Sequence, residues 1–251
     1  MIMNLYIDER IDEVNDKLSL IQKPDGLTFG TDALLLAGYV FGKYKNGAEL
    51  GGGSGIISML LLTRDKVDSI HAYEVQEEYA DLIKRNAEYN KLSDRLCAVC
   101  ADIREISTEE SCDIVFTNPP YMKSDSGKSN LSDKKAIARH ELHGDIGDFC
   151  KAAKKKLKYG GAFYAVYRPD RLADILEAMR ENQLEPKRMT FVHADTKKEA
   201  SMVLIEAKRG GKSGMMLTPP LIIYRDDARR EYSEDMEFVM QNGQFPPKYK
   251  R

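Results

Sequence analysis

The chain has 251 residues and a formal net charge of −2, with 42% apolar and 31% charged residues. This composition is typical of an ordinary soluble globule that is long enough for one large α/β domain. The negative net charge gives no overall affinity for nucleic acid, so a nucleic-acid partner must bind a local basic patch. No apolar stretch approaches the length of a membrane span, and the N-terminus lacks a basic region followed by an apolar core. We therefore expect a cytoplasmic protein with no membrane partner.

The four cysteines are too few for a disulfide scaffold in a chain of this size. Cys97 and Cys100 have the spacing of metal ligands, but no second cysteine pair or histidine pair completes a tetrahedral site. The residues around them read as a strand. We expect no metal.

The N-terminal part predicts a short hairpin, in which residues 18–22 and 27–29 flank a Pro-Asp-Gly turn at residues 24–26. A helix over residues 33–37 follows, with Thr31 or Asp32 as its N-cap. Asp32 has two readings of equal weight. It caps the helix, or its carboxylate faces a cationic ligand.

A glycine turn comes next, between a strand end at residues 48–50 and an apolar helix at residues 56–62. Gly51, Gly53 and Gly55 allow the backbone to turn sharply and to approach a ligand closely, with helix N–H groups facing it. The spacing is Gly-x-Gly-x-Gly, which differs from the Gly-x-Gly-x-x-Gly of dinucleotide sites.

Two acidic residues follow the next two predicted strands, residues 69–74 and 96–101. In a doubly wound sheet, Glu74 at the end of the first would accept hydrogen bonds from both ribose hydroxyls of a nucleoside. Asp102, after the second, would accept from the adenine amine or would simply be a turn residue. A helix with an apolar stripe, residues 77–90, connects the two strands.

The fourth predicted strand, residues 113–117, ends in Asn118, Pro119, Pro120 and Tyr121. Because proline lacks the N–H of a ladder bond, the strand stops there, at the edge where parallel sheets bind ligands. The Asn118 side chain and the Pro119 carbonyl are acceptors that suit an exocyclic amine, and the Tyr121 ring suits an extruded base. The alternative is a strand-terminating turn with a tyrosine packed on it.

The rest of the chain completes the α/β pattern. Residues 122–139 form a long basic loop, read either as a substrate lid or as a solvated loop. A helix over residues 146–157 ends in lysines that suit its dipole and is closed by Gly160 and Gly161. A fifth strand at residues 162–167 and a helix at residues 172–182 follow. Strands at residues 189–193 and 201–207 then pair antiparallel, because their connection is too short for a crossover. A short strand at residues 221–224 lies in a basic tail.

Five β-then-α units closed by an antiparallel strand pair resemble the class I S-adenosylmethionine-dependent methyltransferases over residues 30–207. The resemblance implies a Rossmann-like α/β fold, with a mostly parallel seven-stranded sheet and helices on both faces. It implies one domain, with a hairpin and helix extension at 1–47, a cofactor-binding and catalytic core at 48–207 and a basic extension at 208–251. The cofactor-binding residues it implies are Thr31, Asp32, Glu49, Gly51, Gly53, Gly55, Glu74, Asp102, Ile103 and Asn118. Glu49 departs from the aspartate of many members, but either acid can bind the cofactor's ammonium through a water.

Three further stretches narrow this resemblance: residues 29–37 (Phe-Gly-Thr-Asp-Ala-Leu-Leu-Leu-Ala), 136–141 (Ala-Ile-Ala-Arg-His-Glu) and 219–224 (Pro-Pro-Leu-Ile-Ile-Tyr). Together they resemble the bacterial tRNA (adenine-N6)-methyltransferases that modify the adenosine 3′ to the anticodon of a valine tRNA. The resemblance implies catalysis by Asn118, Pro119, Pro120 and Tyr121. It also implies a tRNA partner, bound through a local basic surface that includes Lys123, Lys128, Lys134, Lys135 and Arg139.

Four alternatives compete with this assignment. Enzymes that methylate a glutamine side chain in release factors, or another RNA or DNA amine, also carry Asn-Pro-Pro-Tyr. The release-factor enzymes have a separate helical domain ahead of the cofactor turn, and only 48 residues precede Glu49 here. A nicotinamide-dependent oxidoreductase would need a glycine turn and an acid but would leave Asn118 to Tyr121 unexplained. A binding-only protein with an inactive methyltransferase fold is disfavoured by the intact constellation.

Overall fold

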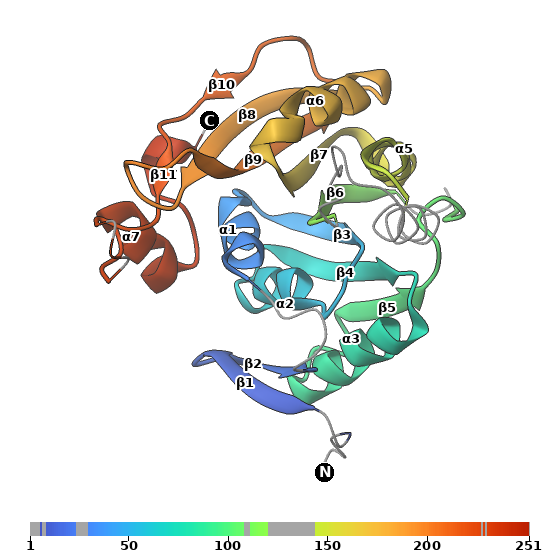
Figure 1. Ribbon diagram of the computed structural model, residues 1–251. Helices are drawn as coiled ribbons and strands as arrows, with labels where there is room; N and C mark the ends of the chain where they lie inside the picture. Colours follow the sequence, from blue (N-terminus) through green and yellow to red (C-terminus); the bar gives the residue numbers. More distant parts are fainter. Residues whose placement is uncertain are drawn as a thin grey trace, which may run out of the picture.

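The computed structural model of the chain describes residues 6, 9–23, 30–107, 111–119, 144–226, 228 and 230–250 (Figure 1). The strands in these parts are β1 (Arg10–Asn15), β2 (Leu18–Gln22), β3 (Tyr44–Leu50), β4 (Val67–Glu74), β5 (Leu96–Cys100), β6 (Cys112–Thr117), β7 (Leu157–Tyr167), β8 (Leu184–His193), β9 (Ala200–Arg209), β10 (Met216–Leu217) and β11 (Leu221–Ile222). The helices are α1 (Thr31–Tyr39), α2 (Ile56–Thr63), α3 (Glu77–Tyr89), α5 (Ile146–Lys156), α6 (Leu172–Glu181) and α7 (Glu234–Asn242), with short 3₁₀ helices η1 (Pro169–Arg171) and η2 (Pro247–Tyr249).

The central sheet has the strand order β10-β8-β9-β7-β6-β3-β4-β5 within the described residues, and β11 also pairs with β8. Pairs β3–β4, β4–β5, β3–β6 and β6–β7 are parallel, whereas β9 runs antiparallel to both of its neighbours, β7 and β8. The order reverses at β3, because β4 lies on one side of it and β6 on the other. The expected parallel sheet with an antiparallel strand pair is confirmed, and ligands bind such sheets at the carboxyl ends of the strands beside this reversal.

Helices cover both faces of the sheet, as the buried side chains of β6 show. Ile114 and Phe116 lie in a core shared with α1, α2, α3 and α7, whereas Val115 lies in a second core shared with α5 and α6. Successive strand residues point to opposite faces, so an apolar run such as that of β6 is buried on both sides. No helix in the described parts of the chain is both long and apolar enough to cross a bilayer.

The N-terminal hairpin differs from the prediction in its pairing. β2 forms where it was expected, but its described partner is β1, across a turn at residues 16–17. The expected turn at residues 24–26 and strand at residues 27–29 lie outside the described residues. Two asparagines of α3 attach the hairpin to the core: Asn86 exchanges hydrogen bonds with the backbone of Ile21 (2.7 and 3.1 Å), and Asn90 does the same with Ser19 (3.0 and 2.8 Å). Their amides act as an additional strand edge for β2.

Two smaller details also differ. The N-cap of α1 is Gly30, with no side-chain cap bond, so neither Thr31 nor Asp32 occupies that position. The helix α5 ends at Lys156 because Leu157 already has extended backbone angles, and Gly160 and Gly161 lie within β7 instead of closing the helix.

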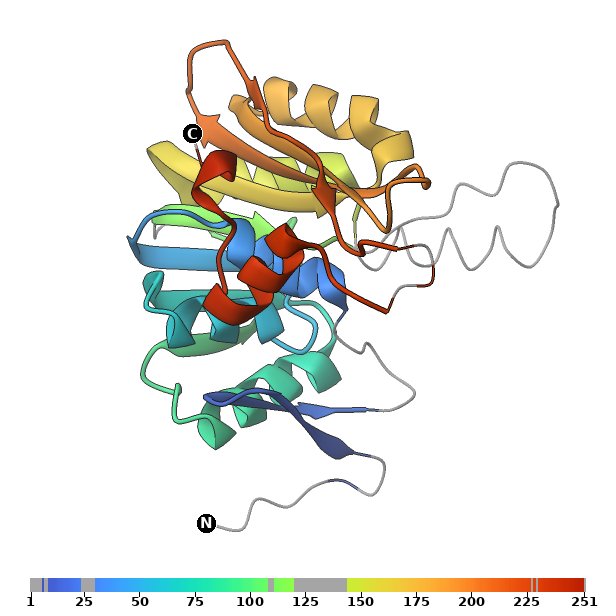
Figure 2. The same cartoon turned by 90° about the vertical axis from the view of Figure 1, so that its left-hand side faces the viewer.

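The segment after β9 is an integral part of the fold. In Figure 2, α7 lies against α1, and a Cβ at Gly38 would lie 3.4 Å from a Val239 methyl group. Arg188 of β8 is fully buried and donates to the carbonyl oxygens of Tyr249 (2.7 Å) and Tyr39 (2.8 Å) and to the Glu206 carboxylate (2.8 Å). Because a buried guanidinium is stable only when its donors are satisfied, this residue couples α1 and the C-terminal segment to the sheet.

Candidate active site

The glycine turn follows β3 at the carboxyl edge of the sheet. The N–H groups of Gly51 and Gly52 both donate to the Tyr73 carbonyl oxygen of β4, at 2.9 and 3.0 Å. Gly51, Gly53 and Gly55 have φ values of 72°, 53° and 79°, in the left-handed region that disfavours side chains. Gly55 is also the N-cap of α2, so the turn delivers the backbone directly to a helix N-terminus, where N–H groups can face a ligand.

Glu74 lies at the end of β4, beside the glycine turn. One carboxylate oxygen accepts from the Gly53 N–H at 2.9 Å and the other from the Gln76 N–H at 3.0 Å, and only 5% of the residue is exposed. These bonds fix the carboxylate against the turn. A carboxylate has about four acceptor positions, so these bonds leave Glu74 with further acceptor capacity toward a bound nucleoside.

Glu49 lies below the turn and faces α2. Its carboxylate accepts from the Ser58 hydroxyl and, at 3.3 Å, from the Ser58 N–H. The pKa of Glu49 is raised to about 8, mainly because the group is buried; the two Ser58 bonds oppose this rise and the charge of Glu74 adds to it. Glu49 is therefore a buried acid that joins the end of β3 to α2, on either side of the glycine turn. The side chain of Ser58, a polar residue in the otherwise apolar run of α2, was not singled out from the sequence.

Asp102 follows β5 and is engaged by Arg104. The Arg104 N–H donates to one carboxylate oxygen at 2.9 Å, and its guanidinium donates to both oxygens. This hydrogen bonding lowers the pKa of Asp102. The turn-residue reading thus describes the present geometry, and an adenine amine would compete with an exposed arginine for this acceptor. The neighbouring Ile103 is buried in the same core as Tyr73 and Phe149, the ring that packs at Gly51.

Asn118 meets Asp32, and their contact joins two of the predicted site residues across 86 positions of sequence. The Asn118 amide nitrogen donates to one Asp32 oxygen at 2.9 Å, while the other oxygen accepts from the Ala33 N–H at 2.9 Å. A Cβ at Gly30 would lie 2.7 Å from this second oxygen, so glycine there leaves room for the carboxylate. Because a carboxylate only accepts, the contact requires the nitrogen of the Asn118 amide on the Asp32 side, with Oδ1 turned away from it.

The end of β6 is held in line with β3. The Thr117 hydroxyl donates to the Leu50 carbonyl oxygen at 2.7 Å, at the point where the two strands pair. The glycine turn and Asn118 are consequently neighbours at the carboxyl ends of β3 and β6. Asp32 comes from the first turn of α1.

The structure thus brings together Asp32, Glu49, the glycine turn, Glu74 and Asn118 at one edge of the sheet. Thr31 is exposed in the first turn of α1, and Pro119 is buried. Pro120, Tyr121 and the predicted RNA-binding residues Lys123, Lys128, Lys134, Lys135 and Arg139 lie outside the described residues. Cys97 and Cys100 are three residues apart on β5, so their side chains leave opposite faces of the strand, and within the described residues no group of three or more acidic, histidine or cysteine side chains is placed to hold a metal.

The glycine turn after β3, Glu74 at the end of β4 and Asn118-Pro119 after β6 together are typical of a methyltransferase. Residues 25–185, more than half of the chain, match the family model described as "Methyltransferase small domain". The chain therefore belongs to this family.

Curated proteins with similar sequences include two bacterial tRNA methyltransferases. The chain is 26% identical over 180 residues to a "tRNA1(Val) (adenine(37)-N6)-methyltransferase" of Dyadobacter fermentans, covering 71% of this chain and 74% of that protein. It is 27% identical over 180 residues to the protein of the same name from Phocaeicola vulgatus, covering 71% and 76%.

Solved structures show the same fold. A predicted O-methyltransferase of Agrobacterium tumefaciens aligns with a TM-score of 0.69 at 21% identity, covering 86% of this chain and 98% of that one. A methyltransferase from Pyrococcus furiosus aligns with a TM-score of 0.58 at 18% identity, covering 79% and 92%.

Proposed function

We propose that the protein transfers a methyl group from S-adenosylmethionine to N6 of an adenosine in tRNA, the reaction after which its curated relatives are named. Those names point to adenosine 37 of a valine tRNA, and a tRNA substrate implies that the enzyme acts in the cytoplasm. The observation that supports the proposal is the hydrogen bond from Asn118 to Asp32, at the same ends of the strands as a turn with three glycines in left-handed conformation.

The residues at this edge fit S-adenosylmethionine. The glycine turn and the N-terminus of α2 offer backbone N–H groups, and Glu74, already fixed against Gly53, offers acceptors suited to ribose hydroxyls. Asp102 or the backbone near Ile103 would contact the adenine. The cofactor supplies a methyl group on a sulfonium, which is electrophile enough that the protein needs to contribute mainly position and electrostatics.

Asp32 is the residue that gives the Asn118 amide its direction. The exocyclic amine of adenine is a poor nucleophile because its lone pair is delocalised into the ring. With the amide nitrogen on Asp32, the Asn118 carbonyl oxygen is the group turned to the other side, and it can accept a hydrogen bond from that amine. The Pro119 carbonyl would accept the second amine hydrogen, and Tyr121 would stack on the flipped base. The amine proton leaves to solvent after transfer, so no residue is required as a strong base.

The tRNA itself would be bound by basic residues, including the four lysines and one arginine of residues 123–139. The net charge of −2 requires such residues to act as a local patch.

The variant Asn118→Ala tests whether Asn118 acts in the methyl transfer or only stabilises the fold. The acceptor it removes gains strength as positive charge develops on nitrogen, so single-turnover methylation of unmodified tRNA should slow by about 10²–10³. Thermal melting should stay near that of the wild type. A variant that melts early but methylates normally per folded molecule would show that Asn118 is only a turn residue.

A further inference from the structure

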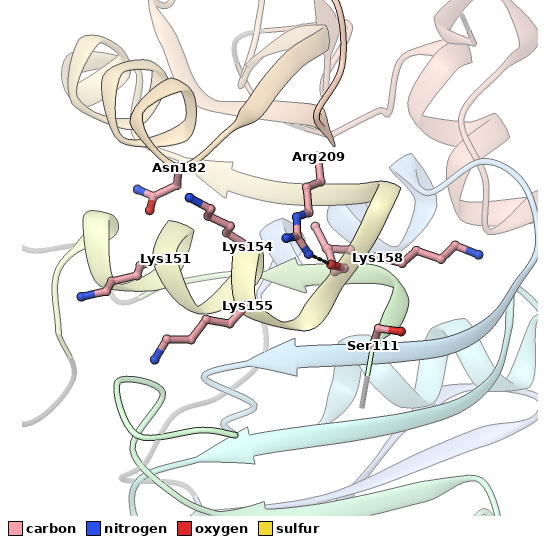
Figure 3. A pocket seen from close by; sticks show the side chains of 8 residues that line it. Ser111, Lys151, Lys154, Lys155, Lys158, Asn182 and Arg209 are labelled. Atoms are coloured by element: carbon pink, nitrogen blue, oxygen red, sulfur yellow. Dashed lines mark hydrogen bonds between the residues drawn. The ribbon is translucent and has the colours of Figure 1, made fainter. Parts of the chain in front are cut away.

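A basic hollow of about 580 Å³ lies where β6 and β7 begin, at the end of the sheet opposite the carboxyl ends of these strands (Figure 3). Its walls come from α5, the first residues of β7, the end of β9 and the end of α6. Five of its described lining residues are cationic and none is acidic: Lys151, Lys154, Lys155, Lys158 and Arg209. On a chain with a net charge of −2, this is a local concentration of positive charge.

Three of these cations have structural partners. Lys158 pairs with Asp113, Lys155 donates to the Arg104 carbonyl oxygen at 3.2 Å, and Arg209 donates to the Leu157 carbonyl oxygen. Lys151 and Lys154 have no carboxylate within ion-pair distance among the described residues. These two lysines are therefore the cations of the hollow that no carboxylate in the described parts of the chain neutralises.

The helix dipole explains only part of the cluster. Lysines in the last turn of α5 complement its carbonyl end, but Lys151 lies about a turn earlier. Lys158 already lies in β7. The other three lysines, at 151, 154 and 155, follow the i, i+3, i+4 spacing of a single helix face, and Figure 3 shows Lys151 and Lys155 extending to the same side. The lysines thus form a row along α5.

This row leads away from the catalytic edge. The helix α5 has 11 residues, or about 16 Å, and its Phe149 packs at Gly51 of the cofactor turn. The hollow lies one strand length away from Asn118, since the six residues of β6 span about 20 Å. A ligand that touches both ends must be much larger than a nucleoside.

An exposed aromatic ring lies beside the hollow. Tyr159 of β7 is 81% exposed, and its hydroxyl donates to the Gly210 carbonyl oxygen at 3.0 Å, next to Arg209. A Cβ at Gly210 would lie 2.1 Å from the ring, so glycine there allows the ring to lie flat against the chain. A fixed ring with an exposed face among cations suits a base or ribose better than a bare anion.

We propose that the row of Lys151, Lys154 and Lys155, with the hollow and Tyr159 at its end, binds the phosphodiester backbone of tRNA outside the modified loop. The inference rests on the proposed function for the identity of the RNA. It assigns the row a role in holding the body of the substrate, at a distance from the methyl transfer.

The test is the paired charge reversal Lys151→Glu with Lys154→Glu. The matched control is Lys17→Glu with Lys84→Glu, two exposed lysines on the hairpin and on α3 that change the net charge equally. Affinity for full-length tRNA should fall about tenfold or more in the test pair, and the slope of log affinity against log salt should drop by about 2, one for each lost phosphate contact. The KM for tRNA should rise while kcat at saturating tRNA and the affinity for S-adenosylmethionine stay unchanged. Should the charge reversal impair folding, Lys151→Gln with Lys154→Gln should still give a smaller loss of the same kind.

The outcomes separate the inference from the proposed function. Wild-type tRNA affinity and salt slope in the test pair would overturn the inference, and so would an equal loss in the control pair. A wild-type protein that binds tRNA through this row but makes no N6-methyladenosine would contradict the proposed function alone. Normal methylation together with unaltered binding by the test pair would contradict the inference alone.

Discussion

Glu49→Gln should make the protein more stable than the wild type, by an amount that grows with pH. Burial raises the pKa of Glu49 from 4.5 to about 8 in the folded chain. Between these values the folded protein carries a proton on Glu49 that the unfolded chain has lost. The stabilisation from this residue is complete below pH 4.5 and is lost as pH rises through about 8.

The magnitude follows from the linkage of protons to folding. Wild-type stability should fall by about 1.36 kcal/mol per pH unit from this residue alone, or about 2.7 kcal/mol between pH 5.5 and pH 7.5. Glutamine keeps an acceptor for Ser58 but has no proton to lose. The free energy of unfolding of the variant should therefore exceed that of the wild type by an increasing margin over this range.

Urea denaturation at half-unit steps of pH measures this margin. Exposed Glu88→Gln is the matched control for the loss of one surface carboxylate. Curves for wild type and Glu49→Gln that stay parallel from pH 5.5 to pH 7.5 would contradict this prediction, because they would mean that the folded protein holds Glu49 ionised.

Three further variants test the site and the fold. Asp32→Ala removes the acceptor that the Asn118 amide nitrogen contacts and should lower kcat about tenfold or more, whereas exposed Asp16→Ala should not. An unchanged kcat would mean that this contact does not orient Asn118. Glu74→Ala should weaken S-adenosylmethionine binding by about 1–3 kcal/mol in calorimetry, and wild-type affinity would remove Glu74 from the cofactor site. Arg188→Ala strands the carbonyl oxygens of Tyr39 and Tyr249 and should cost about 3–5 kcal/mol in urea unfolding. Arg180→Ala, whose side chain is 68% exposed, is its control, and equal midpoints for the two would contradict the coupling role.

The sequence identifies the parts of this fold that local signals specify. The apolar run of β6 predicts a strand buried on both faces, and the glycines at 51, 53 and 55 predict a turn that only left-handed backbone angles allow. All three glycines have positive φ. The short connection after β8 likewise requires the antiparallel pairing that β8 and β9 show.

Contacts between distant residues were outside the reach of such signals. The Asn118 bond to Asp32 depends on how α1 is placed at the ends of the strands. Likewise β2 pairs with β1 and also bonds two asparagine amides of α3. The basic extension at the C-terminus reads as a polar tail, yet Phe245 and Tyr249 are fully buried in it. In each case two segments far apart in sequence complete the interaction, and neither carries a pattern that points to the other.

The central claim is that this chain methylates N6 of an adenosine in tRNA. Its most direct test is mass spectrometry of nucleosides from an unmodified valine tRNA transcript, after incubation with the purified protein and S-adenosylmethionine. We expect N6-methyladenosine, mapped by nuclease fragments to position 37, and little or none of it with Asn118→Ala. An unmethylated transcript, together with methylation of a glutamine in a release factor by the same preparation, would contradict it.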